Sequence, residues 1–220
     1  MCYNMPDMKR MMIVTAGPTR EHLDPVRFLS NPSTGKMGFA LAAAGAAAGF
    51  DVRLVAGPVA LATPKGVKRT DIVSAREMLV AVRALLREAT DGLKPVFIAT
   101  AAVADWRPAR IAAHKLKKAE MSGTLHLVRN PDILKSVHGA VKVGFAAETD
   151  RVLAEAARKC REKKLAFIVA NDITKPGTGF GTETNRVTLV FPDGRTVAWP
   201  LMTKRRVATR IVRTIADLEM

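Results

Sequence analysis

Small and hydroxyl-bearing residues are concentrated between Arg27 and Gly38, where the sequence reads Arg-Phe-Leu-Ser-Asn-Pro-Ser-Thr-Gly-Lys-Met-Gly. This segment follows a short apolar run and precedes an Ala-rich stretch that is typical of a helix. Backbone N–H groups and the positive end of a helix can hold an anion in such a loop. We therefore expect a phosphate cradle, made by Ser33, Thr34, Gly35, Lys36 and Gly38.

The cradle matches neither of the two commonest phosphate-binding sequences. The spacing Gly-x-x-x-x-Gly-Lys-Ser/Thr is absent, and no Gly-x-Gly-x-x-Gly opens the Ala-rich helix. The sequence thus predicts a phosphorylated ligand that is held by a different device.

Other side chains could act on the same ligand. The basic run Lys115–Lys118 is typical either of a solvated surface or of a flap that closes over negative charge in phosphoryl or nucleotidyl transfer. Asp105 could hold Mg²⁺ on a polyphosphate, because hard cations prefer carboxylate oxygens. Asn31 is an amide that can donate to a carbonyl oxygen without reacting. Lys159 and Lys163 are four residues apart and would share one face of a helix.

Strand and helix patterns alternate along most of the chain, which indicates a doubly wound, mostly parallel α/β sheet of the Rossmann-like kind. Pro192-Asp193-Gly194-Arg195 between two alternating runs predicts an antiparallel edge hairpin. Ligands bind at the carboxyl ends of such strands, so the polar segments that follow them should meet at one edge. The strands are expected at 12–16, 51–56, 95–102, 124–128, 141–146, 166–170, 187–191 and 196–199, and the helices at 39–49, 75–88, 151–164 and 203–218.

Four local signals refine this layout. Ser74 and Glu77 form a capping box, and Asn130 is expected to cap a short helix with Pro131 in its first turn. The glycine-rich stretch 177–181 precedes a hairpin rather than a helix, so we expect a surface loop. Residues 106–121 are basic and interrupted by Pro108, which predicts a long excursion over the surface.

Composition limits the class of protein. A chain of 220 residues with 48% hydrophobic residues is long enough for one domain with a substantial core, expected over 12–220 after a tail at 1–11. No apolar run reaches the ~20 residues that span a bilayer, and the two cysteines form no motif, so we expect a cytoplasmic protein without a membrane partner. The formal charge of +15 would suit nucleic acid, but with 5% aromatic residues and no recognition motif we expect none.

Several motifs together resemble phosphopantothenoylcysteine synthetase, the synthetase half of the bacterial bifunctional coenzyme A biosynthesis protein. The similarity runs in order from about residue 12 to 215. It is carried by Val14–Glu21, Ser30–Asn31, Ser33–Gly38, Ala101–Asp105, Lys115–Lys118, Asn130–Ile133, Gly144–Thr149 and Val169–Asp172.

The resemblance implies a ligase that joins 4′-phosphopantothenate to L-cysteine with CTP and Mg²⁺, through an acyl-cytidylate. It also implies a homodimer. No decarboxylase sequence precedes residue 12, so we expect no flavin and no decarboxylation, and association with a separate decarboxylase would be compatible with this. The motifs favour CTP over ATP, without determining the choice.

Residue roles follow from the same resemblance. Asn31 would bind the carbonyl of the acyl intermediate, Arg27 would support the site near the subunit contact, and Lys115 would be the flap lysine at the α-phosphate. Ser33 and Gly35 would contact phosphate, and a side chain larger than that of Ala101 would crowd the ligand. The positions that match CTP-binding residues are Asp105, Asn130, Pro131, Asp132, Ile133, Phe145, Lys159 and Lys163.

Two alternatives remain open at the level of sequence. A nicotinamide-dependent Rossmann reductase is compatible with the expected fold. However, this chain lacks the glycine fingerprint of such a reductase, and it lacks a catalytic tyrosine because its single tyrosine, Tyr3, is too near the start. A basic nucleic-acid module is compatible with the charge, but the basic groups fit a polyphosphate site as well as a duplex.

Overall fold

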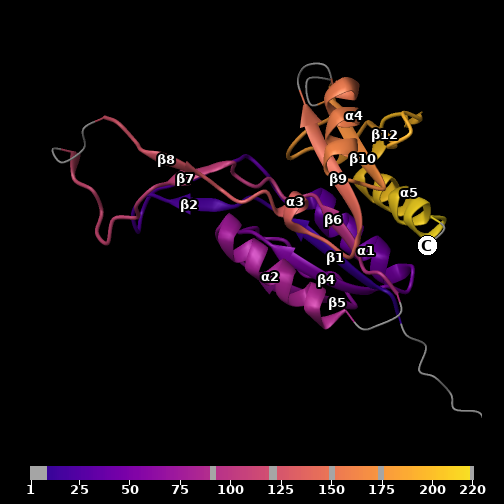
Figure 1. Ribbon diagram of the computed structural model, residues 1–220, viewed down its shortest axis with the longest axis horizontal. Coiled ribbons are helices and arrows are strands. Elements are labelled where there is room, and N and C mark those ends of the chain that lie inside the picture. The colour runs from indigo at the N-terminus through magenta and orange to yellow at the C-terminus, as the bar shows by residue number, and fades with distance from the viewer. Residues whose placement is uncertain (1–8, 90–92, 119–122, 149–151, 173–175, 219–220) are drawn as a thin grey trace, which may run out of the picture.

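The structure is a computed structural model that describes residues 9–89, 93–118, 123–148, 152–172 and 176–218. Its centre is an eight-stranded sheet in the order β13-β12-β10-β9-β6-β1-β4-β5 (Figure 1). The strands from β10 to β5 all pair parallel, whereas β12 pairs antiparallel with both of its neighbours, β10 and β13. This arrangement confirms the predicted mostly parallel sheet with an antiparallel edge. The strands of this sheet are β1 (Met11–Ala16), β4 (Asp51–Ala56), β5 (Val67–Asp71), β6 (Val96–Ala99), β9 (Val141–Glu148), β10 (Phe167–Asp172), β12 (Val187–Val190) and β13 (Thr196–Ala198).

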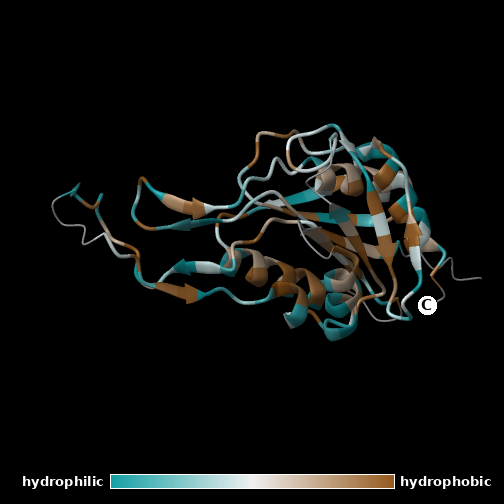
Figure 2. Ribbon diagram, turned by 90° about the horizontal axis from the view of Figure 1, so that it is seen from above, coloured by the Kyte–Doolittle hydropathy of each residue, from teal (hydrophilic) through white to brown (hydrophobic). Residues whose placement is uncertain are grey.

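Helices cover both faces of this sheet. α1 (Lys36–Ala47) and α5 (Lys204–Ala216) pack on one face, and α2 (Ala75–Glu88), α3 (Ile133–Ser136) and α4 (Val152–Glu162) on the other. Strand residues alternate between the two cores: Val14 faces α1, whereas its neighbour Ile13 faces α2. Figure 2 shows the apolar colour along the strands and on the helices that cover them. None of the described helices is both long and apolar enough to cross a bilayer.

The chain reverses its direction of winding at β1. It proceeds from β1 through β4 to β5 on one side, and from β6 through β9 to β10 on the other. The carboxyl ends of β1 and β6 are therefore adjacent at a topological switch point, where the chains that leave them diverge and open a crevice. We call this edge the rim, and define it by residues 15–19, 33–38 and 100–105.

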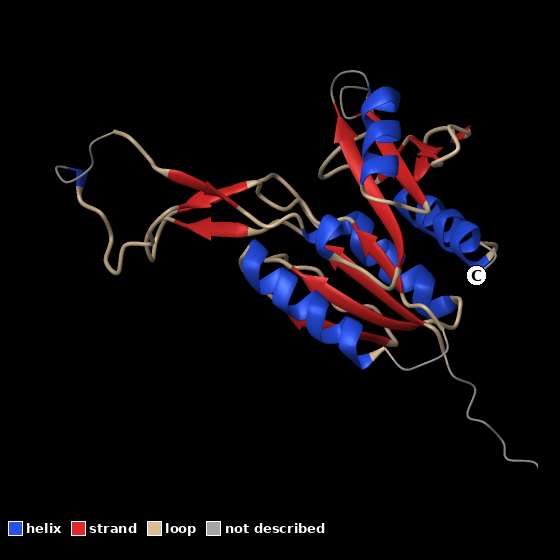
Figure 3. Cartoon of the chain, viewed as in Figure 1, coloured by secondary structure: helices blue, strands red, loops and turns tan. Residues whose placement is uncertain are grey.

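Two antiparallel ribbons leave the rim together and form an arm, residues 20–30 and 106–129 (Figures 1 and 3). One ribbon pairs β2 (Arg20–His22) with β3 (Phe28–Ser30), and the other pairs β7 (Trp106–Pro108) with β8 (Leu127–Arg129). The predicted surface excursion at 106–121 is this arm, although residues 119–122 lie outside the described part of the chain. A last small ribbon pairs β11 (Thr184–Asn185) with β14 (Met202–Thr203).

Some predicted boundaries were wrong. The strand expected at 95–102 ends at Ala99, because the backbone then turns to bond the chain that leaves β1. The helix expected from Phe39 begins at Lys36, with Gly35 in left-handed geometry as its N-cap. The tail expected at 1–11 is partly a strand, since Met11 opens β1, and residues 1–8 lie outside the described part. The capping box at Ser74 is confirmed: its Oγ accepts from the Glu77 amide at 3.2 Å.

The short helix α3 is capped by Asp132 and not, as predicted, by Asn130. The Asp132 carboxylate accepts from the Lys135 amide at 2.9 Å. Asn130 is occupied elsewhere, because its side-chain amide donates to the Ala104 carbonyl at 2.8 Å. The residue that sequence reasoning assigned to the helix thus ties β8 to the rim.

Candidate active site

The two chain segments of the rim are joined directly to each other. The Ala102 amide donates to the Gly17 carbonyl at 2.9 Å, and Pro18 and Ala102 form a parallel bridge. The hydroxyl of the fully buried Thr19 accepts from the Ala104 amide at 3.0 Å. These bonds fix the turn that carries Ala101 and Asp105 against the chain that carries the cradle.

The cradle depends on two glycines for different reasons. Gly35 has φ +76°, a left-handed conformation in which an L side chain is strained. A Cβ on Gly38 would lie 2.5 Å from the Ala16 Cβ and 2.6 Å from the Thr100 Oγ1, so only glycine allows α1 to approach the ends of β1 and β6 this closely. The N-terminus of α1 is thereby brought to the rim, where its free amides can hold an anion. Ser33 lies partly buried beside it, with its Oγ accepting from the Gly35 amide at 3.4 Å.

A small cavity of about 80 Å³ opens at the cradle. The buried Asn171 at the end of β10 lines it, and its Oδ1 has no hydrogen-bond partner among the described residues. A buried polar atom without a partner is costly, and a donor on a bound ligand would satisfy it. The cavity is lined by Ser33, Thr34, Gly35, Lys36, Met37, Gly38, Thr100, Phe145, Ala146, Ala147, Asn171, Gly179, Phe180, Asn185 and Lys204.

Sequence reasoning missed the contribution of the glycine-rich loop to this cavity. Lys204 is buried and donates to the carbonyls of Thr182 at 2.6 Å and Gly179 at 3.1 Å. Lys36, expected in the cradle, donates to the Gly181 carbonyl at 2.9 Å and pairs with Glu183. These two lysines hold the loop over the cradle, with Phe180 in its wall. The sequence signal that was available is the pair of lysines, each next to a helix start.

A larger cavity of about 520 Å³ lies beside the cradle, within the range of small-molecule sites. Phe145 on β9 lines both cavities, so the two adjoin at this residue. The larger one brings together most of the residues predicted to bind CTP, namely Asp105, Asn130, Pro131, Asp132, Ile133, Phe145 and Lys163, together with Ala101, where a larger side chain was predicted to crowd the ligand.

An ion pair closes one side of this larger cavity. The Lys163 ammonium lies 2.8 Å from the Asp132 carboxylate. Partial burial raises the pKa of Asp132, but the hydrogen bonds from Lys163 and from the Lys135 amide outweigh it, and the net pKa lies below the usual value. Lys159, one turn earlier on α4, is not among the residues that line the cavity.

The Asp105 carboxylate is the best placed group for a hard cation. It is exposed at the end of the 101–105 turn, lines the larger cavity, and makes no ion pair with any residue in the described ranges. The same ranges contain no cluster of three or more His, Cys, Asp and Glu residues that could hold a metal. A single free carboxylate fits Mg²⁺ that takes its other oxygens from phosphates and water.

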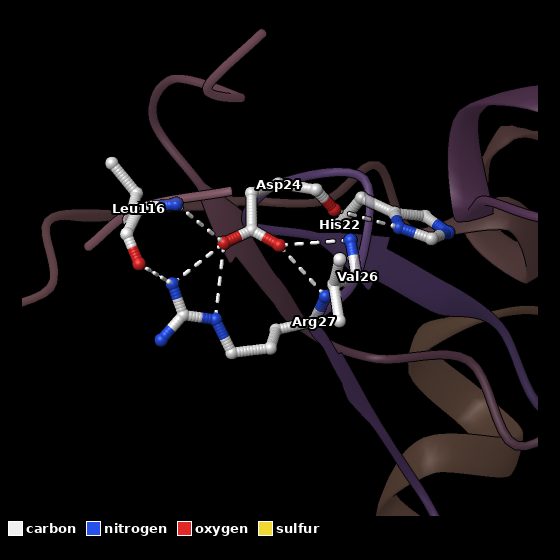
Figure 4. A network of polar contacts seen from close by, with 5 residues as sticks. All are labelled: His22, Asp24, Val26, Arg27 and Leu116. Atoms are coloured by element: carbon white, nitrogen blue, oxygen red, sulfur yellow. Dashed lines mark hydrogen bonds and ion pairs between the residues drawn. The ribbon is translucent and has the colours of Figure 1, made fainter. Parts of the chain in front are cut away.

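Arg27 lies in the arm and not at either cavity. Its guanidinium binds the Asp24 carboxylate, with Nη2 at 2.6 Å and Nε at 3.0 Å, and Nη2 also donates to the Leu116 carbonyl at 2.9 Å (Figure 4). Asp24 is fully buried and accepts in addition from the amides of Val26, Arg27 and Leu116. The hydrogen bonds from the Arg27 guanidinium, followed by those from the backbone amides, hold the pKa of Asp24 well below its usual range.

The same network positions the start of the basic run. Leu116 follows Lys115 in the chain, so both its carbonyl and its amide are fixed to the Arg27–Asp24 pair (Figure 4). Lys115 is exposed and lines neither cavity. Asn31 lies in the chain between the arm and the cradle. Its side-chain amide donates to the Val103 carbonyl at 3.1 Å, and Val103 lines the larger cavity.

The fold and the site define a doubly wound α/β protein with a nucleotide-sized cavity beside the predicted phosphate cradle. A family model described as the DNA/pantothenate metabolism flavoprotein C-terminal domain matches residues 8–218, and the chain belongs to this family.

Two similar proteins share one name. The chain is 46% identical over 220 residues to the coenzyme A biosynthesis bifunctional protein CoaBC of Vibrio vulnificus strain YJ016, covering 97% of this chain and 53% of that protein. With the protein of the same name from Escherichia coli K12 it is 47% identical over 197 residues, covering 86% and 47%. The chain thus spans about half the length of the curated relatives it matches.

Solved structures agree with this placement. The crystal structure of the C-terminal domain of CoaBC superimposes with a TM-score of 0.76 at 41% identity, covering 94% of this chain and 93% of that one. A Cab2 mutant in complex with phosphopantothenate-cysteine gives a TM-score of 0.77 at 17% identity, covering 94% and 86%, a likeness of fold alone.

Proposed function

We propose that this chain is a single synthetase domain that joins 4′-phosphopantothenate to L-cysteine with CTP, in coenzyme A biosynthesis. The observation that carries the proposal is the pair of cavities that meet at Phe145, one at a phosphate cradle and one of nucleotide size. A ligase that activates a phosphorylated acid needs both substrates side by side. Membership of the family supports the same reaction.

The reaction takes place in two displacements. The carboxylate of 4′-phosphopantothenate attacks the α-phosphorus of CTP, and the bond to the bridging oxygen breaks to release pyrophosphate. The cysteine amine then attacks the acyl carbon of the acyl-cytidylate, loses a proton as the amide forms, and releases CMP. Mg²⁺, held by Asp105, would offset the charge of the triphosphate.

The chain's residues divide these tasks by position. Ser33, Gly35 and the N-terminus of α1 would bind the phosphate of phosphopantothenate, and the unpartnered Oδ1 of Asn171 would accept from an N–H or O–H group farther along that substrate. Asn31 lines neither cavity as the chain stands, but it bonds to Val103, which lines the larger one, and would bind the acyl carbonyl from there. The other residues that line the larger cavity would hold the nucleotide. Lys163 and Lys159 would contact it from the side of α4.

Lys115 can act as the flap lysine only if the arm reaches a bound nucleotide. Lys115 lies away from both cavities, and exposed apolar side chains gather on the same arm, where Figure 2 also shows apolar stretches. Exposed apolar patches of this kind mark contact surfaces. A homodimer formed through the arm would cover them, and Arg27 would then lie near the subunit contact. The exposed residues are Val26, Phe28, Trp106, Ile111, Leu125, Leu127 and Val128.

We further propose a cytoplasmic enzyme that binds no flavin and leaves decarboxylation to a separate domain or protein. Nothing in the lining of the larger cavity favours a nicotinamide reductase or a nucleic-acid module over the ligase. CTP is preferred to ATP in this proposal on the resemblance of the motifs alone.

Pyrophosphate release tests the proposal. With 4′-phosphopantothenate, CTP and Mg²⁺ the chain should release pyrophosphate, and CMP should follow when L-cysteine is added. Substitution of ATP for CTP in the same assay measures the nucleotide preference. Release no faster than in a sample without protein would refute the ligase.

A further inference from the structure

A third hollow, next to the cradle cavity, opens on the face of the sheet that α1 and α5 cover. Its volume is about 1030 Å³, and it meets the cradle cavity at Lys36 and Lys204. The groups that close one side of it belong to α5, and those on the other side belong to α1 and the chain after β4. We call it the α5 groove and define it by Lys36, Phe39, Ala40, Leu61, Ala62, Pro64, Glu183, Thr203, Lys204, Arg205, Arg206, Thr209, Arg210 and Arg213.

The lining of the α5 groove is strongly cationic. Arg206, Arg210 and Arg213 are separated by four and three residues, so they share one face of α5. Among the residues that the structure describes, neither Arg206 nor Arg213 makes a side-chain hydrogen bond or ion pair. Glu183 is the one acidic residue in the described lining, and its carboxylate is paired with Lys36.

This arrangement of charge destabilises the helix that carries it. Like charges at these spacings repel each other, and α5 has no acidic residue in its first turn to offset them. On α4, by contrast, Arg158 is paired with Glu155 and Glu162. An anion bound in the groove would supply the charge that the protein itself does not.

The opposite wall of the α5 groove is apolar and fixed. Phe39, Leu61 and Pro64 line it, and the Leu61 carbonyl accepts from the Arg69 guanidinium at 2.8 Å. An apolar wall facing a cluster of cations suits a molecule with a charged end and an apolar body. A flat or extended basic surface would instead follow a nucleic-acid backbone.

We propose that the α5 groove is a binding site for a small molecule with two or more phosphate-type charges and an apolar portion. The groove shares Lys36 and Lys204 with the wall of the cradle cavity, but none of the residues to which we assign a contact with a ligase substrate lines it. Its cations bind the anionic end, and Phe39, Leu61 and Pro64 contact the apolar portion.

A local fluorescent reporter allows a direct test. The chain has two tryptophans, and the Arg210 guanidinium lies 5.6 Å from the ring centroid of Trp199. In a Trp106→Phe background Trp199 is the sole tryptophan. A ligand that binds Arg210 should therefore change the emission of Trp199. The probes are inorganic pyrophosphate and geranyl diphosphate, which share the anionic group and differ in the apolar tail.

The expected result is a saturable change in Trp199 emission, with geranyl diphosphate binding more tightly than pyrophosphate. Arg206→Gln with Arg213→Gln should raise the midpoint at least about tenfold, because charge-assisted contacts are lost while the reporter pair stays intact. Arg83→Gln with Arg87→Gln removes the same charge from exposed positions on α2 and should leave the midpoint unchanged.

Three results would overturn the proposal. One is an emission that does not change, or changes without saturation, with either probe. Another is an equal shift of the midpoint in both double variants, which would reduce the effect to overall charge. The third is a short duplex DNA that binds this face more tightly than geranyl diphosphate and loses affinity with Arg206→Gln and Arg213→Gln.

Discussion

The rim and the arm are built from the same two stretches of chain, yet different forces hold them. At the rim the backbones approach so closely that a Cβ on Gly38 would lie 2.5 Å from the Ala16 Cβ. In the arm one buried carboxylate, Asp24, gathers a guanidinium and three backbone amides. The rim therefore depends on close packing, whereas the arm depends on a charge. The predictions below test this contrast, in order of decreasing expected effect.

Asn31, where the two regions meet, should show the largest effect. Asn31→Asp replaces a donor to the Val103 carbonyl with a carboxylate, and should slow amide formation by about 10³-fold while pyrophosphate release persists. Quenched-flow analysis of acyl-cytidylate and product separates the two steps. Asn31→Ser removes the amide without adding charge and should show a similar loss. Normal turnover by Asn31→Asp would exclude the residue from the mechanism.

Lys115 tests whether the arm acts in the chemistry. Lys115→Gln should slow pyrophosphate release by about 10²- to 10³-fold, the usual cost of removing one group that stabilises transition-state charge. Lys118→Gln, an exposed change in the same basic run, is the matched control and should leave the rate nearly unchanged. If pyrophosphate release by Lys115→Gln is as fast as by the unmodified chain and by Lys118→Gln, the whole run is solvated surface.

Asp24→Asn should disconnect the arm from its charge. Because its pKa is depressed in the folded state, Asp24 stabilises the arm fully above its unfolded pKa of about 3.9, and this contribution is lost as the pH falls through the lower folded value. The Leu116 amide should therefore exchange its hydrogen faster in the variant at pH 7. The protection of this amide should also change less on acidification than in the unmodified chain, and mass spectrometry measures both.

The same variant should lower activity about tenfold, because Lys115 remains present but is no longer held in position. Asp193→Asn, at an exposed hairpin, serves as the control for the loss of one carboxylate. Unchanged exchange at Leu116 in Asp24→Asn would show that the arm is held by something other than this network.

Gly38→Ala tests the dependence of the rim on volume. The added methyl has no space against Ala16 and Thr100, so α1 must shift, at a cost of about 1–3 kcal/mol in the free energy of unfolding. Ala43→Leu adds more volume on the exposed face of the same helix and should change stability by less than about 0.5 kcal/mol. Urea unfolding measures both, and equal stability of Gly38→Ala and the unmodified chain contradicts the close approach.

The ion pair of Asp132 and Lys163 should have the smallest effect. Asp132→Asn keeps a good N-cap for α3 and removes only the pairing, which is partly exposed and should contribute less than about 1 kcal/mol. A double-mutant cycle with Lys163→Met isolates the pair. A coupling energy well above that value would mean that the wall of the larger cavity, like the arm, depends on charge.

Much of the scaffold was predictable from local pattern. The Ser74–Glu77 capping box, the edge hairpin and the parallel core follow from residue order and turn chemistry, and the structure confirms each. The cap of α3 was mispredicted because Asn130 and Asp132 are both good caps, and only the position of the Ala104 carbonyl selects between them. The roles of Asn31, Lys115 and the other site residues remain predictions.

The amino-acid sequence by itself determined the alternation of strands and helices, the small residues of the cradle and the motifs that define the family, since these depend on neighbours a few residues apart. The tertiary structure alone decided that Phe145 joins two cavities, that Lys204 and Lys36 hold the glycine-rich loop over the cradle, and that Arg27 fixes the backbone next to Lys115. Each of these contacts joins residues far apart in the chain. The periodicity of a sequence carries no information on such distances, which arise only when the sheet orders its strands.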